Sequence, residues 1–196
     1  MPKPQPDWPK TLDEFRAWHE RRPEVWEFMH GVPKLITPGS KAHTLIKSNA
    51  GRLLGSALER TGCRVLIDGA IIEVEGSSLI PDVVVTCSPL DFATPRVDDP
   101  IIIVEVLSPW SEKDDTGRKL ALYLGIPSLR HYLMIDQEWR QIVHHERRDD
   151  LGGAFLTTIA PPDPLRLEPP GIELALGALY EGVPLAAAGQ PAPTSA

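Results

Sequence analysis

The run Ile101-Ile102-Ile103-Val104-Glu105-Val106-Leu107 is continuous and apolar apart from one carboxylate. Because six of its seven side chains suit a hydrophobic core, the run predicts a central strand that is buried on both faces. An ionised carboxylate is costly to bury without a partner. We therefore expect Glu105 to pair with a cation, to bind a metal ion or to stay protonated.

A second apolar run, from Leu79 to Val85, repeats this pattern with Asp82 as its only charged residue. Two carboxylates on neighbouring strands that point to one place can hold a divalent cation such as Mg²⁺, which prefers oxygen ligands. Such an ion activates water and stabilises the charge that develops on a phosphoryl group. Lys119 is the candidate to neutralise the phosphate or orient the water, because it lies on the helix predicted after the Glu105 strand.

Length and composition limit the class of protein. A chain of 196 residues suits one domain with a real core, and 27 acidic against 20 basic residues give no overall positive field, so any nucleic-acid contact must be local. Cys63 and Cys87 are too few for a disulfide scaffold and lack the spacing of a zinc site, which favours a reducing compartment. We expect no membrane span and a cytoplasmic protein, since no apolar run approaches about 20 residues and Met1 to Lys10 has no signal-peptide core.

Hydrophobic periodicity predicts the order of the elements. A capping box at Thr11 begins a short helix to about residue 22, two short strands follow in 25–36, and Ser40 caps a long helix to about residue 60. Strands are then predicted at 64–67, 71–75 and 80–86, with a turn at 76–78, and at 101–107, 130–136, 141–145 and 155–159.

A helix at 113–124 lies between two of these strands, and strand, helix and strand from 101 to 136 predict a parallel pair. The fold class is therefore α/β or α+β, with a mixed central sheet flanked by helices. We expect a flexible N-terminus at 1–10, one folded domain at 11–160, a C-terminal extension at 161–185 with one or two helical turns at 172–179, and a disordered tail at 186–196.

Several spaced motifs together are similar to one known family. They are Ile80-Pro81-Asp82, then Val104-Glu105-Val106-Leu107-Ser108-Pro109, then Asp115, Gly117, Lys119 and Tyr123, then Ile126-Pro127 and Tyr132-Leu133-Met134-Ile135-Asp136. These motifs resemble the Uma-type restriction endonuclease family, and Trp26-Glu27-Phe28-Met29-His30-Gly31 resembles that family's first acidic stretch. The likeness covers roughly residues 11–147, and its specificity lies in the spaced combination.

The resemblance implies a nuclease of the PD-(D/E)XK type with a restriction-endonuclease-like fold. Asp82 then matches the first metal ligand and Glu105 the second, while Glu27 matches an acid that supports the site. The pattern departs from the superfamily at Leu107, which stands where the motif lysine usually is, and Lys119 resembles the family's helical lysine instead. His30 replaces an aspartate, and Trp110 stands where a small polar residue is usual.

Each of these residues also has a structural interpretation. Asp82 would only bond backbone amides at a strand entrance, Glu105 would pair with an arginine, and Glu27 would be solvated. Lys119 would form a helix-surface ion pair with Asp115, four residues before it.

Other polar residues leave a choice between contact with DNA and an ordinary surface role. For His43, one alternative is contact with phosphate or metal, and the other is a polar contact at the start of a helix. We favour the second. A basic cluster touches the DNA backbone or protects an edge strand, and it comprises Arg140, His144, His145, Arg147 and Arg148. Tyr123 and Trp139 receive no chemical role.

The sequence thus predicts a nuclease that depends on Mg²⁺, with Mn²⁺ as a substitute in the site, and that hydrolyses phosphodiester bonds in DNA. Its site residues would be Asp82, Glu105, Lys119 and Glu27. We expect a homodimer, since two sites cut two strands. The alternatives are a non-catalytic nucleic-acid-binding protein on the same fold and an interaction module that dimerises through exposed apolar strands, with 172–185 as an interface arm.

Overall fold

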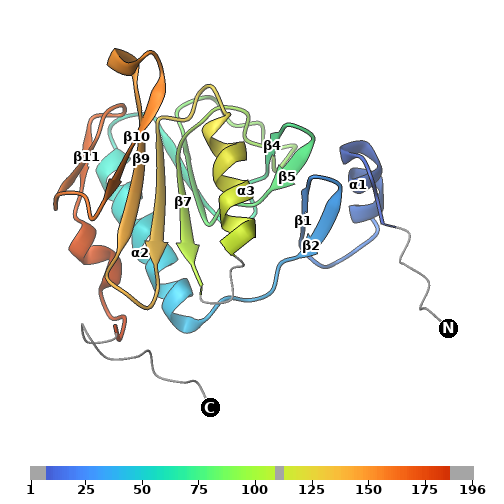
Figure 1. The fold of residues 1–196 in the computed structure, drawn as a ribbon, viewed down its shortest axis with the longest axis horizontal. Helices are drawn as coiled ribbons and strands as arrows, with labels where there is room; N and C mark the ends of the chain where they lie inside the picture. Colours follow the sequence, from blue (N-terminus) through green and yellow to red (C-terminus); the bar gives the residue numbers. More distant parts are fainter. Residues whose placement is uncertain (1–7, 109–112, 186–196) are drawn as a thin grey trace.

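A six-stranded sheet with the order β10-β9-β8-β7-β6-β3 forms the centre of the computed structural model, which describes residues 8–108 and 113–185 (Figure 1). The predicted central strand is β7 (Pro100–Leu107), which lies between β6 (Val83–Thr86) and β8 (His131–Asp136). β7 pairs antiparallel with β6 and parallel with β8. The predicted mixed sheet and its parallel pair are confirmed.

The remaining strands of this sheet extend it on both sides. β3 (Arg64–Ile67) forms one edge, and β9 (Ile142–Arg148) pairs with β8 and with β10 (Ala154–Ile159), which forms the other edge. A short 3-10 helix, η1 (Asp149–Leu151), connects β9 to β10. The predicted strand at 155–159 is therefore confirmed, it lies at the edge of the sheet, and β9 is an interior strand.

One face of the sheet is covered by α2 (Lys41–Leu58), whose apolar stripe includes Ile46, Ala50 and Leu54. The helix begins where the sequence predicts, because the Ser40 side chain accepts a hydrogen bond from the backbone N–H of His43. The apolar spacing of α2 thus directs one of its faces into the core and leaves its first turns at the edge of the sheet.

The C-terminal segment covers the same face. It consists of β11 (Leu165–Leu167), β12 (Ile172–Leu174) and the 3-10 helix η2 (Leu176–Tyr180), and its buried leucines join the core beneath α2. The helical turns that we expected at 172–179 begin only at residue 176, because residues 172–174 pair with β11 instead.

The opposite face is covered by α3 (Lys113–Leu124), whose Leu122 and Tyr123 are buried. Beside it lies a second sheet of order β2-β1-β5-β4, made of β1 (Trp26–Met29), β2 (Val32–Leu35), β4 (Ile72–Val74) and β5 (Ser77–Leu79). In Figure 1, α1 (Leu12–His19) with β1 and β2 lies to the right of the main body. α1 is tied to β4 because Arg16 donates hydrogen bonds to both oxygens of Glu73.

We expected one strand at 80–86, but the apolar run from Leu79 to Val85 is divided between the two sheets. β5 ends at Leu79 and β6 begins at Val83. Pro81 lies in the link, where its missing N–H takes no place in a ladder. The predicted turn at 76–78 is shorter, since Glu75 and Gly76 have φ of 47° and 72° and form a two-residue hairpin turn. Asp82 therefore stands at the junction of the sheets.

Cys63 and Cys87, whose number and spacing indicated no disulfide scaffold, are joined by a disulfide. They flank β3 and β6, in which Arg64 lies opposite Thr86, so the strand pairing brings them together. Because disulfides persist in oxidising surroundings, the cysteines no longer favour a reducing compartment.

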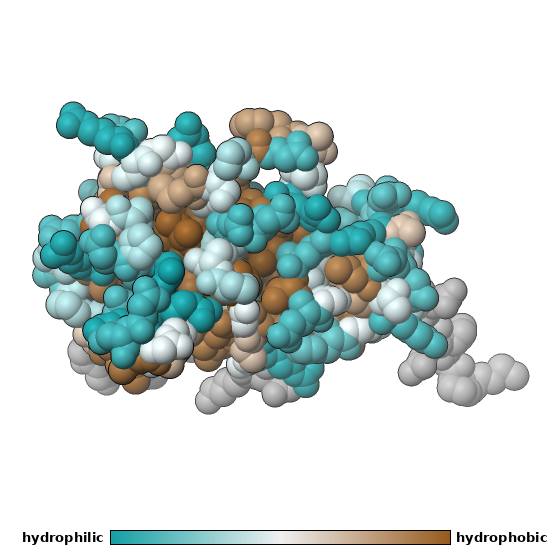
Figure 2. All heavy atoms as spheres, turned by 90° about the horizontal axis from the view of Figure 1, so that it is seen from above, coloured by the Kyte–Doolittle hydropathy of each residue, from teal (hydrophilic) through white to brown (hydrophobic). Residues whose placement is uncertain are grey.

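Within the described residues, no helix has the length and apolarity needed to cross a bilayer. Seen from above, the surface consists mainly of hydrophilic residues, with apolar side chains visible between them (Figure 2). The expectations of a flexible N-terminus at 1–10 and a disordered tail at 186–196 concern residues that are mostly outside the described ranges, as is Trp110.

Candidate active site

Asp82 lies directly before β6, and one further step of the β6–β7 register from the Val83–Val104 pair places it opposite Glu105. Its Oδ2 accepts a hydrogen bond of 2.7 Å from the backbone N–H of Val106. The carboxylate thus takes the place of a backbone acceptor at the end of the ladder. The backbone contact that we considered as a structural role is present, and it holds Asp82 beside the acid of the neighbouring strand.

Two side chains of α2 also reach Asp82. His43 Nε2 lies 3.2 Å from Oδ2, and Lys47 Nζ lies 3.6 Å from Oδ1. Burial alone would raise the pKa of Asp82, but the contacts with His43, the Val106 amide and the Lys47 charge outweigh burial and lower it. Asp82 is therefore ionised at neutral pH, and its contacts with His43 and Lys47 lie on the α2 side.

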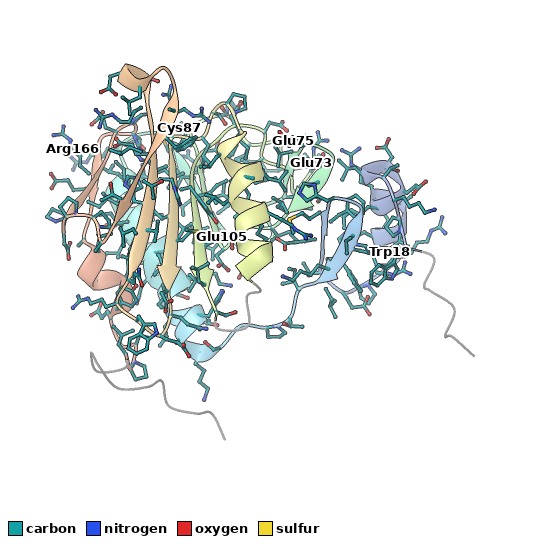
Figure 3. All side chains as sticks on the ribbon, viewed as in Figure 1. Trp18, Glu73, Glu75, Cys87, Glu105 and Arg166 are labelled. Atoms are coloured by element: carbon teal, nitrogen blue, oxygen red, sulfur yellow. A yellow bond between two sulfur atoms is a disulfide. The ribbon has the colours of Figure 1, made fainter. Side chains whose placement is uncertain are left out.

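Glu105 projects from β7 toward α3 (Figure 3). The Tyr123 hydroxyl donates a hydrogen bond of 2.9 Å to its Oε1, and Lys119 Nζ lies 3.4 Å from the same oxygen. Burial, together with the charges of Asp82 and Glu27, raises the pKa of Glu105 to about 7, although Lys119 and Tyr123 act in the opposite direction. Glu105 therefore exchanges its proton close to neutral pH. Its expected pairing with a cation is present, but the cation is a lysine and not an arginine.

Glu27 and Lys119 complete the cluster. The Glu27 side chain is only 2% exposed, and its Oε1 lies 2.7 Å from Lys119 Nζ and accepts a hydrogen bond from the Ile80 N–H. Lys119 thus bridges Glu27 of β1 and Glu105 of β7. The solvated role considered for Glu27 is wrong, since β1 is covered by α1 and pairs with β5. The Asp115 side chain, considered as a partner of Lys119, lies outside the described side chains.

Comparison with known proteins gives the family. Residues 12–177 match the Uma2 family, which is described as "Putative restriction endonuclease". The chain belongs to this family. Two uncharacterised proteins of Synechocystis sp. are similar to it: slr1290 is 30% identical over 184 residues, 92% of this chain and 96% of that protein, and sll1609 is 28% identical over 145 residues, 71% and 82%.

A solved structure from Anabaena variabilis, described as a "putative nuclease belonging to DUF820", has a TM-score of 0.71 at 18% identity and covers 88% of this chain and 98% of that chain. This likeness shows that the Uma2 chain has the fold of that structure, and the predicted fold class is confirmed. The identity is too low for residue roles to be transferred from it.

Three residues of this Uma2 family member face the acids although the sequence gave them little or no weight. Tyr123 received no chemical role, a polar contact at a helix start was favoured for His43, and Lys47 was not considered. The signal available was helical spacing, because residues four apart share one face of a helix. His43 and Lys47 have this spacing on α2 and face Asp82, and Lys119 and Tyr123 have it on α3 and face Glu105.

The two histidines at the centre of the predicted basic cluster near the β8–β9 hairpin do not face solvent. His144 and His145 are 4% and 5% exposed, since β9 is an interior strand. His144 Nε2 lies 3.0 Å from His131 Nδ1, and burial lowers the pKa of both histidines to about 4. Arg147 donates to backbone carbonyls of the surrounding loops. Both interpretations of this cluster are therefore wrong at its centre.

The donor set suits a small, hard cation better than a transition metal. No group of three or more histidine, cysteine or acidic side chains lies in a metal-binding arrangement within the described residues. Mg²⁺ needs only one or two carboxylates and keeps waters in its other positions. Asp82 and Glu105 supply such a pair, and within the described residues the Tyr123 and Lys119 contacts both fall on Oε1 of Glu105.

Proposed function

We propose that this chain is a divalent-metal-dependent nuclease that hydrolyses phosphodiester bonds in DNA. The observation that supports it is the convergence of Glu27, Asp82, Glu105 and Lys119 from four separate parts of the fold. Acids held together in an apolar interior raise the free-energy cost of ionising one another. Proteins retain such clusters mainly at functional sites. Membership of a family described as restriction endonucleases agrees with this chemistry.

Asp82 and Glu105 would hold Mg²⁺, or Mn²⁺ in its place. When bound there, the ion would lower the pKa of a water molecule and offset the charge that develops on the phosphoryl group. Because a ligating carboxylate must be ionised, and the pKa of Glu105 is about 7, cation binding would release a proton near neutral pH.

The other residues of the cluster act through position and charge. Lys119 would contact a phosphoryl oxygen or orient the attacking water. It would thus take the role of the motif lysine, which usually stands two residues after the second acid. Glu27 would hold Lys119 in reach, since its carboxylate lies 2.7 Å from the ammonium group. Tyr123 would keep Glu105 in one orientation through its hydrogen bond.

The formal net charge of −7 means that the substrate must be held locally, by cations around the site, and not by the field of the whole molecule. Two copies with two sites would cut the two strands of a duplex, so we also propose that the chain acts as a homodimer. Measuring the solution mass by light scattering tests the dimer independently of activity.

Two variants test the function. Asp82→Asn and Glu105→Gln keep the size of each side chain but remove the charge. Both should abolish the cleavage of plasmid DNA in Mg²⁺ and the binding of Mn²⁺ measured by isothermal titration calorimetry. Glu173→Gln removes the same charge from an exposed position on β12 and serves as the control. Full cleavage by Glu105→Gln would refute the assignment. DNA binding without cleavage by the unsubstituted chain would favour the non-catalytic alternative.

A further inference from the structure

A second pair of cationic or hydrogen-bonding groups faces the site from the side opposite Lys119. His43 and Lys47 lie one helical turn apart on α2, and each side chain is 14% exposed. Both contact Asp82, whereas Lys119 contacts Glu27 and Glu105. The roles proposed above for the acids and Lys119 leave this α2 pair without a task.

The contacts of Lys47 exceed what the burial of Asp82 requires. Asp82 already accepts a hydrogen bond from the Val106 amide and has His43 Nε2 at 3.2 Å. The shortest contact of Lys47 is 2.7 Å to Oδ1 of Asp68, a side chain that is 65% exposed. An ion pair with such an exposed partner contributes about 0–1 kcal/mol. The shortest contact of Lys47 is thus one that a stronger anion can replace.

The position of the His43 ring is also determined by its surroundings. Its Nδ1 is buried and has no hydrogen-bond partner within the described part of the chain. Gly39 provides the room for the ring, because a Cβ at this position would lie 2.8 Å from Nδ1 and 2.9 Å from Cγ of His43. The imidazole is therefore packed against the chain on one side and presented to Asp82 on the other.

We propose that His43 and Lys47 form a phosphate-binding subsite that takes a backbone phosphate of the nucleic acid next to the bond that is cut. This inference rests on the proposed function, in which Asp82 shares its charge with a divalent cation. Its attraction for the α2 pair is then weaker, and a phosphodiester oxygen becomes the better partner. Lysine is a common phosphate ligand, and a phosphate contact adds affinity without sequence preference.

The test is the salt dependence of DNA binding, measured by fluorescence anisotropy of a labelled duplex in Ca²⁺ with the full chain. Lys47→Gln keeps the length of the side chain but removes its charge. It should weaken binding to unrelated duplexes alike and reduce the slope of log K against log salt by about 0.9, the value for one phosphate contact. Lys47→Arg should retain the slope. His43→Ala removes the hydrogen-bonding atoms of the ring and should also weaken binding.

Lys41→Gln is the matched control. It removes the same charge from the exposed start of the same helix, and at about 3.6 residues per turn it lies on a different face from residues 43 and 47. An unchanged slope and affinity for Lys47→Gln, in a chain whose unsubstituted form binds and cuts DNA, would overturn the subsite and leave the nuclease intact. If the unsubstituted chain neither binds nor cuts DNA, the proposed function fails, and the subsite fails with it.

Discussion

Replacing Glu105 by Gln should stabilise the folded chain at alkaline pH. Burial raises the pKa of Glu105 from 4.5 to about 7, so the folded state favours the protonated acid more than the unfolded state does. Below pH 4.5 both states carry the proton and the carboxyl adds no penalty. Between pH 4.5 and 7 the unfolded chain loses the proton first, so the free energy of unfolding falls as pH rises.

The size of this effect follows from the pKa values. Each pH unit between the two pKa values corresponds to about 1.4 kcal/mol, so the ionised Glu105 costs the fold about 3 kcal/mol at pH 8 and less than about 1 kcal/mol at pH 5. Gln resembles the protonated acid and avoids this cost. Glu105→Gln should therefore raise the free energy of unfolding by up to about 3 kcal/mol at pH 8, with little change at pH 5.

Urea unfolding followed by tryptophan fluorescence at the two pH values measures this difference, and Glu173→Gln on exposed β12 is the control. Ca²⁺ provides a second reading, because a ligand that binds only the folded chain stabilises it by mass action. It should stabilise the unsubstituted chain and not Glu105→Gln. A variant less stable than the unsubstituted chain at pH 8 would refute the reasoning, since it would make Glu105 a favourable structural partner of Lys119 and Tyr123.

Three further predictions concern single groups. Tyr123→Phe removes a hydrogen bond to the ionised form of Glu105, so the pKa of Glu105 should rise by about one unit and the lower limit of the pH–cleavage profile should move up equally; Tyr180→Phe, which loses a bond to the Gln141 carbonyl, should leave the profile unchanged. His144→Gln should flatten the acid side of the stability curve, because the folded chain holds the pKa of His144 at about 4 and loses stability as pH falls from 6.5 toward 4; urea unfolding at several pH values checks this, and an equally steep loss in the variant would contradict it. Gly39→Ala should weaken duplex binding in Ca²⁺ by displacing the His43 ring, whereas Gly55→Ala, with no atom within 4 Å of its added Cβ, should not; equal affinity of the two variants would contradict the placement of the ring.

The fold could be predicted largely because its main elements have clear apolar periods. The helix at 113–124 and the strand at 64–67 have the predicted bounds, and the central strand begins one residue early. The run from Leu79 to Val85 misled us, since an apolar run does not reveal which of two sheets receives each half. We predicted residues 161–185 to be an extension because proline and glycine separate their apolar residues. The leucines among them nevertheless fill the core under α2.

Positions of the acids were easier to predict than the positions of their partners. A single charge in an apolar strand is visible in a sequence, and Asp82 and Glu105 do lie opposite one another. Lys47 and Tyr123 sit in ordinary amphipathic helices, where a charged or aromatic residue has no special appearance. Their relevance depends on which strand each helix covers, and His144 illustrates the same limit, because only the position of β9 inside the sheet makes it a buried residue.

The helices α2 and α3 contact different acids of the site. The α3 pair contacts the acid whose pKa is raised to about 7, and the α2 pair contacts the acid whose pKa is lowered. A cation entering between the acids would therefore find Asp82 already ionised and would have to displace a proton only from Glu105. In our proposal, pH would control the loading of the cation through Glu105 alone, while Lys47 on α2 would keep its positive charge for the substrate. The stability that the fold gives up at Glu105 is, in our proposal, the consequence of keeping that ligand poised near neutral pH.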